Sequence, residues 1–241
     1  SVLWNGVQVD APPHEGPAPD LGARESPAPP ANVLTVGAGG AFADIGAAIG
    51  AATSPYTIVR ISPGSYPAFS IGASAPYGLG VTGDGTGPVT IDTTTQAVKV
   101  EGLPASGAVV LVGLTIGDGA SANVGLLVNA CAGLVLVDDV VVHGGVSKPG
   151  LRVVASTRTV VQSADIDGMP GLRLDNGARV VASRGTLDEF ALAGMSQLTT
   201  CQLAATGTPG PGSLHVPLAR MMPHVAGPLF LALQTPLALT L

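Results

Sequence analysis

Two neighbouring stretches of the sequence hold the side chains that come closest to a catalytic pattern. Asp138, Asp139 and His143 fall in one stretch, and Asp165 and Asp167 fall in the next. A repeat of about 25 residues would place Asp139 and Asp165 almost above one another. Paired carboxylates are the groups that acid–base hydrolysis of a glycosidic bond requires. The alternative, which we favour, is that these are solvated positions on an outward face.

Basic residues accompany the acidic ones. Arg152 and Arg173 occupy equivalent positions in two "GLR" segments, and Lys148 lies nearby. Stacked arginines can grip an acidic sugar, but pairing with Asp165 or Asp175 is the expectation we prefer, because it keeps a strand edge soluble.

Metal and cofactor chemistry has little support in the sequence. The four histidines lack the close spacing of a zinc site, and the two "GDG" segments are isolated turns rather than tandem calcium-binding repeats. We therefore expect no metal and no cofactor. Cys131 and Cys201 could form one bridge, but we prefer free buried thiols because a small apolar cysteine suits a core.

Composition restricts the class of protein. The net charge of −6 provides no basic patch for phosphates, so we expect no nucleic-acid partner, and no apolar run is long enough for a membrane span. Only 3% of residues are aromatic, whereas glycine numbers 34 and proline 21. This profile is typical of short aliphatic strands between many turns. The chain begins at Ser1 without a basic and apolar leader, which indicates a processed or excised chain.

An internal repeat indicates how those strands are arranged. Segments beginning at Gly125, Gly150 and Gly171 read "GLLVNACAGLVLVDDVVV", "GLRVVASTRTVVQSADID" and "GLRLDNGARVVASRGTLD". Each starts with Gly-Leu and holds two strand-like runs, without a helical pattern. Repeats of about 20 to 25 residues without helices predict a parallel β-solenoid, in which each coil buries its inner side chains against the next. Asn129 and Asn176 fall at roughly equivalent positions and could stack at a corner.

The chain divides into three regions. Residues 1–32 hold a short strand pattern and a Pro-rich arm, residues 33–205 hold the solenoid, and residues 206–241 hold a Gly-Pro linker and apolar strands. An amphipathic helix is expected over Phe42 to Ala52, where it would cap the exposed edge of the first coil.

The opening of the solenoid resembles that of a known superfamily. "VLTVGAGGAFADIGAAIGAA", "YTIVRISPGSYPAFSI" and "GLGVTGDGTGPVTID" are similar to the first coil of right-handed parallel β-helix proteins of the pectin lyase-like superfamily. The resemblance implies an all-β right-handed parallel β-helix with a short N-terminal capping helix and Pro63-Gly64 at a corner. The superfamily's lyases use calcium-binding carboxylates with a basic residue, and its polygalacturonases use clustered aspartates with a histidine. No such motif can be matched here residue by residue.

Apolar strand patterns at both ends of the chain suggest an interaction role. They lie beyond Pro-rich segments, where a self-contained enzyme has little need of them. A cap on the last coil is the alternative at the C-terminal end. The candidate interaction residues are Val2, Trp4, Val7, Val9, Leu229, Leu231, Leu233, Leu237 and Leu239.

These observations lead to one preferred function and one alternative. We expect a non-enzymatic structural or interaction protein, extracellular or at the cell surface, that assembles with itself into an oligomer or filament through terminal strands. The alternative is a small carbohydrate-active or carbohydrate-binding protein that uses Asp138, Asp139, Asp165 and Arg152 on a polysaccharide.

Overall fold

The computed structural model describes residues 2–4, 7–9, 32–117, 123–187, 190–193 and 196–205. The chain divides into two compact units, Ser1–Ala31 and Asn32–Leu241. In the first unit β1 (Val2–Trp4) pairs antiparallel with β2 (Val7–Val9). The predicted strand pattern of the first ten residues is therefore a pair of strands. The Pro-rich arm and residues 206–241 lie outside the described residues.

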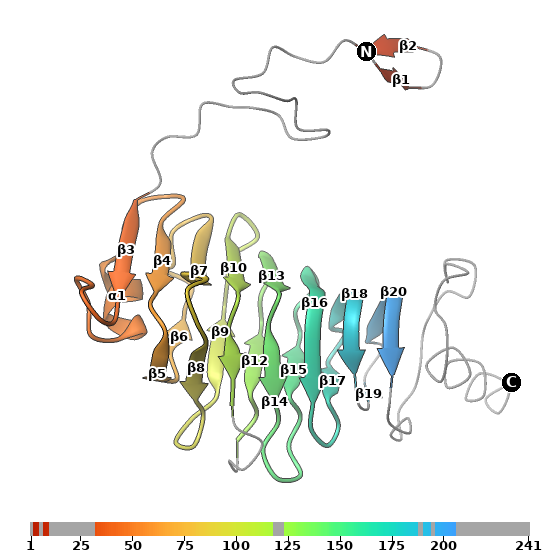
Figure 1. Cartoon of the computed structure of the whole chain (residues 1–241). Coiled ribbons are helices and arrows are strands. Elements are labelled where there is room, and N and C mark those ends of the chain that lie inside the picture. The colour runs from red at the N-terminus through yellow and green to blue at the C-terminus, as the bar shows by residue number, and fades with distance from the viewer. Residues whose placement is uncertain are drawn as a thin grey trace, which may run out of the picture. The chain divides into compact units, whose positions relative to one another are not determined.

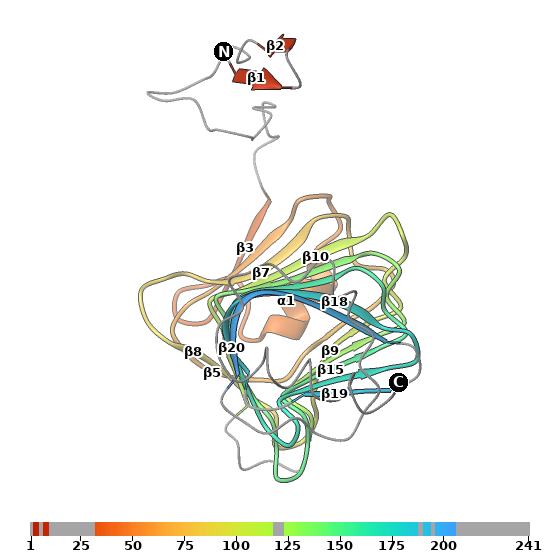
Figure 2. The same cartoon turned by 90° about the vertical axis from the view of Figure 1, so that its right-hand side faces the viewer.

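The second unit is a parallel β-solenoid, as predicted. Its strands wind around three faces, and the third face is a sheet of six parallel strands, one for each coil. Figure 1 shows the strands of successive coils side by side, and Figure 2 shows the coils stacked around a common interior. Strands dominate, and the fold is all-β with one short helix among the described residues.

The first and second faces share their later strands. The first face begins with β3 (Val33–Val36), β4 (Ile58–Ile61), β7 (Leu79–Gly83), β10 (Ala108–Val112) and β13 (Leu134–Asp138). The second face begins with β5 (Gly64–Pro67), β8 (Val89–Asp92), β11 (Thr115–Ile116) and β14 (Val141–His143). Three longer strands bend around the corner and belong to both faces: β16 (Thr159–Asp167), β18 (Arg179–Leu187) and β20 (Gln197–Ala205).

The third face closes each coil. Its strands are β6 (Ser70–Ile71), β9 (Val98–Glu101), β12 (Leu126–Asn129), β15 (Leu151–Val154), β17 (Leu172–Asp175) and β19 (Phe190–Leu192). Leu126, Leu151 and Leu172 are in register, so the Gly-Leu repeat read from the sequence marks equivalent positions on this face. All strand pairs of the solenoid are parallel, which requires that each coil pass through all three faces before it reaches its neighbour.

The corner at Pro63 and Gly64 is built as the first-coil motif predicts. Gly64 has a φ of 153°, which side-chain-bearing residues rarely adopt, and it begins β5 directly after the proline. Tyr66 is buried, and its hydroxyl donates a hydrogen bond of 2.8 Å to the carbonyl of Ser62. The buried tyrosine therefore stabilises the turn by a hydrogen bond to its backbone. The Pro-Gly-x-Tyr sequence is a structural motif in this chain.

The N-terminal end of the solenoid is covered by α1 (Ile45–Ala51). Asp44 caps this helix by accepting a 2.7 Å hydrogen bond from the Ala47 amide. Ile45 and Ala48 are buried, and the helix contacts β3 and β4. The predicted helix began too early, because Phe42 forms a bridge with Val36 instead. No helix within the described ranges has the length or hydrophobicity needed to cross a membrane.

The core is a set of stacked aliphatic columns. Inward and outward positions alternate along most described strands of the solenoid, and the inward side chains are almost wholly valine, leucine, isoleucine and alanine. One column on the second face runs through Ile91, Ile116, Val142 and Ile166, each in register with the next. A full Ile or Val burial contributes about 1.5 to 3 kcal/mol, so these columns are the main stabilising feature.

The alternation yields a direct test. Ile116→Asp should abolish cooperative folding, because an unpaired buried carboxylate costs several kcal/mol against a total stability of about 5 to 15 kcal/mol. The neighbouring Thr115→Asp is the matched control, since Thr115 is only half-buried. Circular dichroism during denaturation with urea measures both. Equal midpoints for the two variants would contradict the inward placement of Ile116.

Candidate functional site

The carboxylates singled out from the sequence do not converge. Asp138 is the last residue of β13 on the first face, and Asp139 follows it at the corner. Asp165 lies in register with Val141, and not with Asp139. The expected stacking of Asp139 over Asp165 is therefore wrong by two residues. Asp165 is instead exposed and accepts hydrogen bonds from the amide and hydroxyl of Thr186, at 3.2 and 2.8 Å.

Asp139 has a conformational role at its corner. Its φ is 51°, and the equivalent residues of the coils on either side, Gly113 and Ser163, have φ values of 64° and 50°. The Gly113 amide donates to the Asp139 carbonyl at 3.0 Å, and the Asp139 amide donates to the Gln162 carbonyl at 3.2 Å. Asp139 is thus one member of a column of left-handed residues that turns the chain from the first face to the second. Asparagine, aspartate and glycine are the residues that tolerate this conformation best.

Asp138, the neighbour of Asp139 in the sequence, is hydrogen-bonded to Gln162. The Gln162 Nε2 donates to Asp138 Oδ2 at 3.0 Å across neighbouring coils. Because Asp138 and Gln162 are in register, this contact is a cross-strand side-chain pair of the kind that stabilises a sheet.

His143 and Asp167 form the closest histidine–carboxylate contact among the described residues. They end β14 and β16 in register, and His143 Nδ1 lies 2.7 Å from Asp167 Oδ2. The two side chains are 29% and 45% exposed, so the pair is at the surface and not in a closed cleft. A carboxylate on one imidazole nitrogen can orient the other nitrogen for proton transfer. No group of three or more potential metal ligands occurs among the described residues, so this pair is not part of a metal centre there.

The arginines of the "GLR" segments pair with a buried carboxylate. Arg152 and Arg173 are in register on the third face, and the Nε atoms of both donate to Asp175 Oδ2, at 2.9 and 3.1 Å. The Asp175 side chain is only 9% exposed, whereas the two arginines are 40% and 47% exposed. The preferred pairing of these arginines with an aspartate is confirmed for Asp175. Arg152 consequently lies on a different face from Asp138 and Asp165.

The carboxylates of Asp84 and Asp92 form hydrogen bonds within local turns. Asp84, in the first "GDG" segment, accepts hydrogen bonds from the amide and hydroxyl of Thr86 at 2.8 and 2.6 Å. Asp92 accepts one from the Thr94 amide at 2.7 Å. These hydrogen bonds lower the pKa of both carboxyl groups by stabilising their ionised forms. The aspartates are turn residues of the Asx type.

Cys131 is a free buried thiol that packs in the core. Its Sγ lies 3.4 Å from the carbonyls of Val100 and Asn129, and burial raises the pKa of the thiol. A raised pKa suppresses the nucleophilic thiolate, so Cys131 has a packing role. The expected stacking of Asn129 with Asn176 is wrong by one residue, because Asn129 shares its register position with Val154 and Asp175.

The C-terminal end of the solenoid differs from the helix-covered end. β20 has nine residues and, among the described residues, pairs only with β18. β19 on the third face pairs only with β17 within the same described part of the chain. Both strands therefore present backbone donors and acceptors along one edge without a described partner. The candidate interaction residues Leu229, Leu231, Leu233, Leu237 and Leu239 lie outside the described residues.

The structure also brings together two arginines that were not singled out. Arg158 and Arg179 become neighbours at the start of the first face, because Thr159 is in register with Val180. They are 21 residues apart, the same offset that relates Arg152 to Arg173. That shared offset was the available signal, and applying the repeat to every charged residue would have found the pair.

Comparisons with protein-family models, with curated proteins and with solved structures give no match for this chain. The functional argument therefore depends on the geometry of the molecule alone.

The corner position of Asp139 leads to a prediction that a catalytic role would not make. Asp139→Gly should raise the free energy of unfolding by about 0.5 to 1 kcal/mol, because glycine adopts a φ of 51° without steric cost. Asp165→Gly is the control, since Asp165 lies within a strand and glycine weakens strands by about the same amount. Urea denaturation of both variants measures the difference. A clear loss of stability in Asp139→Gly would show that its side chain does more than tolerate the turn.

Proposed function

We propose that this chain is a non-enzymatic extracellular structural or interaction protein that assembles with copies of itself through its terminal segments. The carrying observation is the C-terminal edge of the solenoid, where β20 has one described neighbour. An unpaired strand edge is a template for strand addition by another chain. The opposite end is covered by α1, so the two ends of the solenoid differ in the described part of the chain.

The N-terminal pair of strands is suited to be the added element. β1 and β2 pair only with each other among the described residues, and they belong to a unit separate from the solenoid. An isolated two-stranded hairpin is at best marginally stable in water, so it gains stability by docking on a further strand. Val2, Trp4, Val7 and Val9 would supply apolar contacts, and the leucines from Leu229 to Leu239 would supply the receiving surface.

The length of the arm permits contact with a neighbouring molecule. Residues 10–31 comprise 22 residues, which extend to about 68 Å at about 3.1 Å per residue. Six coils rise only about 29 Å at about 4.8 Å per coil. Because the donor and the receiver are different surfaces, the contact is head-to-tail, and repetition builds an open filament unless the rotation closes.

The handedness of the solenoid and its superfamily are part of the same proposal. The Pro63-Gly64 corner, the buried Tyr66 and the capping helix support membership of the right-handed pectin lyase-like superfamily. Right-handed crossovers are the strong rule for parallel strands. The location that we propose is outside the cell or at its surface.

The carbohydrate-active alternative is less well supported. It requires Asp138, Asp139, Asp165 and Arg152 around one substrate. Arg152 points its Nε to Asp175 on the third face, and Asp165 is two positions away from the expected register. An acidic polysaccharide is the partner that this alternative requires, and the activity test below addresses it.

Assembly can be tested with a single substitution in the first strand. Full-length protein should form particles much larger than the 23.6 kDa chain as its concentration rises. Trp4→Asp should shift the population to monomers, because a charge on the apolar hairpin opposes docking, whereas the control Trp4→Phe should still assemble. Light scattering and electron microscopy measure the particle size. A monomeric full-length protein, or equal assembly by Trp4→Asp, would refute the proposal.

Activity on polysaccharides separates the two functions. We expect no release of unsaturated or reducing ends from pectate, polygalacturonate or alginate, with or without calcium. Release that disappears in Asp139→Ala or Asp165→Ala would establish the carbohydrate-active function in place of the structural one.

A further inference from the structure

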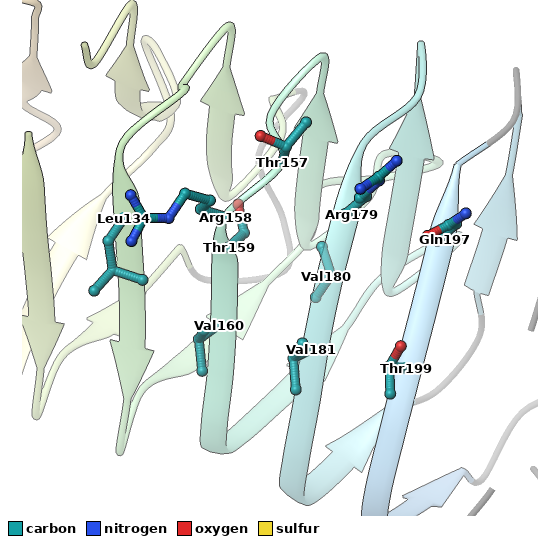
Figure 3. A pocket seen from close by; sticks show the side chains of 10 residues that line it. All are labelled: Leu134, Thr157, Arg158, Thr159, Val160, Arg179, Val180, Val181, Gln197 and Thr199. Carbon is teal, nitrogen blue, oxygen red and sulfur yellow. The ribbon is translucent and has the colours of Figure 1, made fainter. Parts of the chain in front are cut away.

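A hollow on the outer side of the first face lies next to the Arg158 and Arg179 pair and apart from the carboxylates described above. It has a volume of about 320 Å³ and crosses four strands, β13, β16, β18 and β20. Figure 3 shows its lining side chains. The volume lies at the lower end of the range for small-molecule pockets, about 300 to 1,000 Å³.

One edge of the hollow is positively charged. Arg158, Arg179 and Gln197 occupy successive positions of one column, since Arg179 is in register with Gln197 and Thr159 with Val180. Figure 3 shows the three side chains in a row along this edge. Both arginines are exposed, and neither forms an ion pair with a described residue.

The two charges are therefore left without a counter-charge in the described part of the chain. Arg158 Nη1 donates one hydrogen bond, to the Ala105 carbonyl at 3.4 Å, which leaves most of its five N–H groups uncommitted. Like charges on adjacent positions of neighbouring strands destabilise a sheet. An anion placed along this edge would remove that repulsion.

The rest of the hollow is largely aliphatic. Val160 and Val181 are in register and face outward, and Val181 is 47% exposed although it is a large apolar residue. Leu134 completes the apolar part of the lining. Exposed aliphatic groups next to unpaired cations suit a ligand that has both an acidic end and an apolar body.

A buried hydroxyl in the same lining is also unsatisfied. Thr159 is 1% exposed, and its Oγ1 has no hydrogen-bond partner among the described residues. Thr159 is in register with the buried Val135 and Val180, so its side chain lies on the core side of β16. The unsatisfied hydroxyl therefore belongs to the interior, and the ligand argument depends on the outward arginines and valines.

We propose that the hollow is a binding site for a carboxylate carried on a short aliphatic body. The planar guanidinium groups of Arg158 and Arg179 match a carboxylate in charge and in the geometry of paired hydrogen bonds. The aliphatic body covers Val160 and Val181 and removes their surface from water. A sulfate or phosphate would satisfy the arginines but leave the valines exposed. Two sources can supply this chemistry: a free small carboxylate, or an acidic residue in the Pro-rich arm, which contains Asp10, Glu15, Asp20 and Glu25.

The test is titration of the full-length protein with hexanoate, followed by calorimetry or by NMR shifts of the Val160 and Val181 methyl groups. Hexanoate should bind, and acetate should bind about tenfold more weakly because it lacks the apolar body. Hexylamine, which has the same body with the opposite charge, should not bind. The double variant Arg158→Gln/Arg179→Gln should weaken hexanoate binding at least about tenfold.

Arg60→Gln is the matched control, because Arg60 is an exposed arginine of β4 on the same face but outside the hollow. It should leave the affinity for hexanoate unchanged. The absence of hexanoate binding, equal binding of hexylamine, or equal loss in Arg60→Gln would each overturn the proposal. All the substituted arginines are exposed, so circular dichroism should show that every variant folds.

A further variant identifies the source of the carboxylate. Asp10→Asn/Glu15→Gln/Asp20→Asn/Glu25→Gln removes the acidic groups of the arm without changing any residue of the hollow. A higher affinity for hexanoate in this variant would show that the arm competes for the site, and an unchanged affinity would assign the site to a free ligand. Both results presuppose specific binding and support the site. Neither depends on self-assembly, so the proposed function is tested separately.

Discussion

Every coil of this protein depends on the coil next to it. The inward side chain of one coil is buried only because an equivalent side chain lies in register above or below, as Ile116 lies between Ile91 and Val142. The backbone hydrogen bonds run in the same direction, from coil to coil. A single coil thus has neither a core nor a satisfied backbone, and stability grows only as coils are added. This dependence explains why the chain needs a cap at α1 and why it matters that β20 has only β18 as a partner among the described residues.

Stacking also governs the corners. Gly102, Ala130, Ala155 and Asn176 form a second left-handed column, with φ values of 67°, 52°, 48° and 55°. A left-handed conformation costs an ordinary residue about 1 kcal/mol or more. The ladder holds it in place, since the Ala130 amide donates to the Val154 carbonyl and the Ala155 amide to the Asp175 carbonyl. Corner residues are therefore selected by backbone conformation. An aspartate at such a corner, as at position 139, resembles a catalytic residue in sequence without being placed as one.

The sequence was sufficient to predict the solenoid but not the register on every face. The Gly-Leu repeat gave offsets of 25 and 21 residues, and these hold on the third face, where Leu126, Leu151 and Leu172 align. On the first face Val135 aligns with Thr159, an offset of 24. One residue is lost at the corner between the third and first faces, because the step from Asn129 to Val135 is six residues, whereas the equivalent step from Val154 to Thr159 is five.

That single residue accounts for one of the two positions by which Asp165 misses Asp139, and the other arises because an offset of 25 already places Asp139 over Ala164. The offset measured on the third face was applied to Asp139 and Asp165, which lie beyond the shortened corner. A repeat of a solenoid is set separately on each face, because corners tolerate insertions that strands do not. The pairing of Arg152 with Asp175 was predictable because both lie on the face whose register the repeat fixes.

The outward positions of the first face are the main departure from a plain solenoid. On the second face the outward column holds Ser65, Thr90, Thr115, Val141 and Asp165, which is polar except at Val141. On the first face β10 reads "AVVLV", and its outward Val110 is in register with Leu136 of β13. Strands that are apolar on both sides are typical of sheets covered on both sides.

The interior cannot carry the specificity of this molecule, because each inward position must match its neighbours in size and polarity. Outward positions have no such constraint, so an aliphatic outward column reflects a requirement other than folding. Val160 and Val181 continue that column, and Arg158 and Arg179 lie beside it, two residues earlier on the chain. The arginines keep the apolar surface soluble. They also make it asymmetric, because the positive charge lies along one side of the valines only. A surface of this kind selects what binds it by the arrangement of an acidic group and an apolar group, and it needs no catalytic residue to do so.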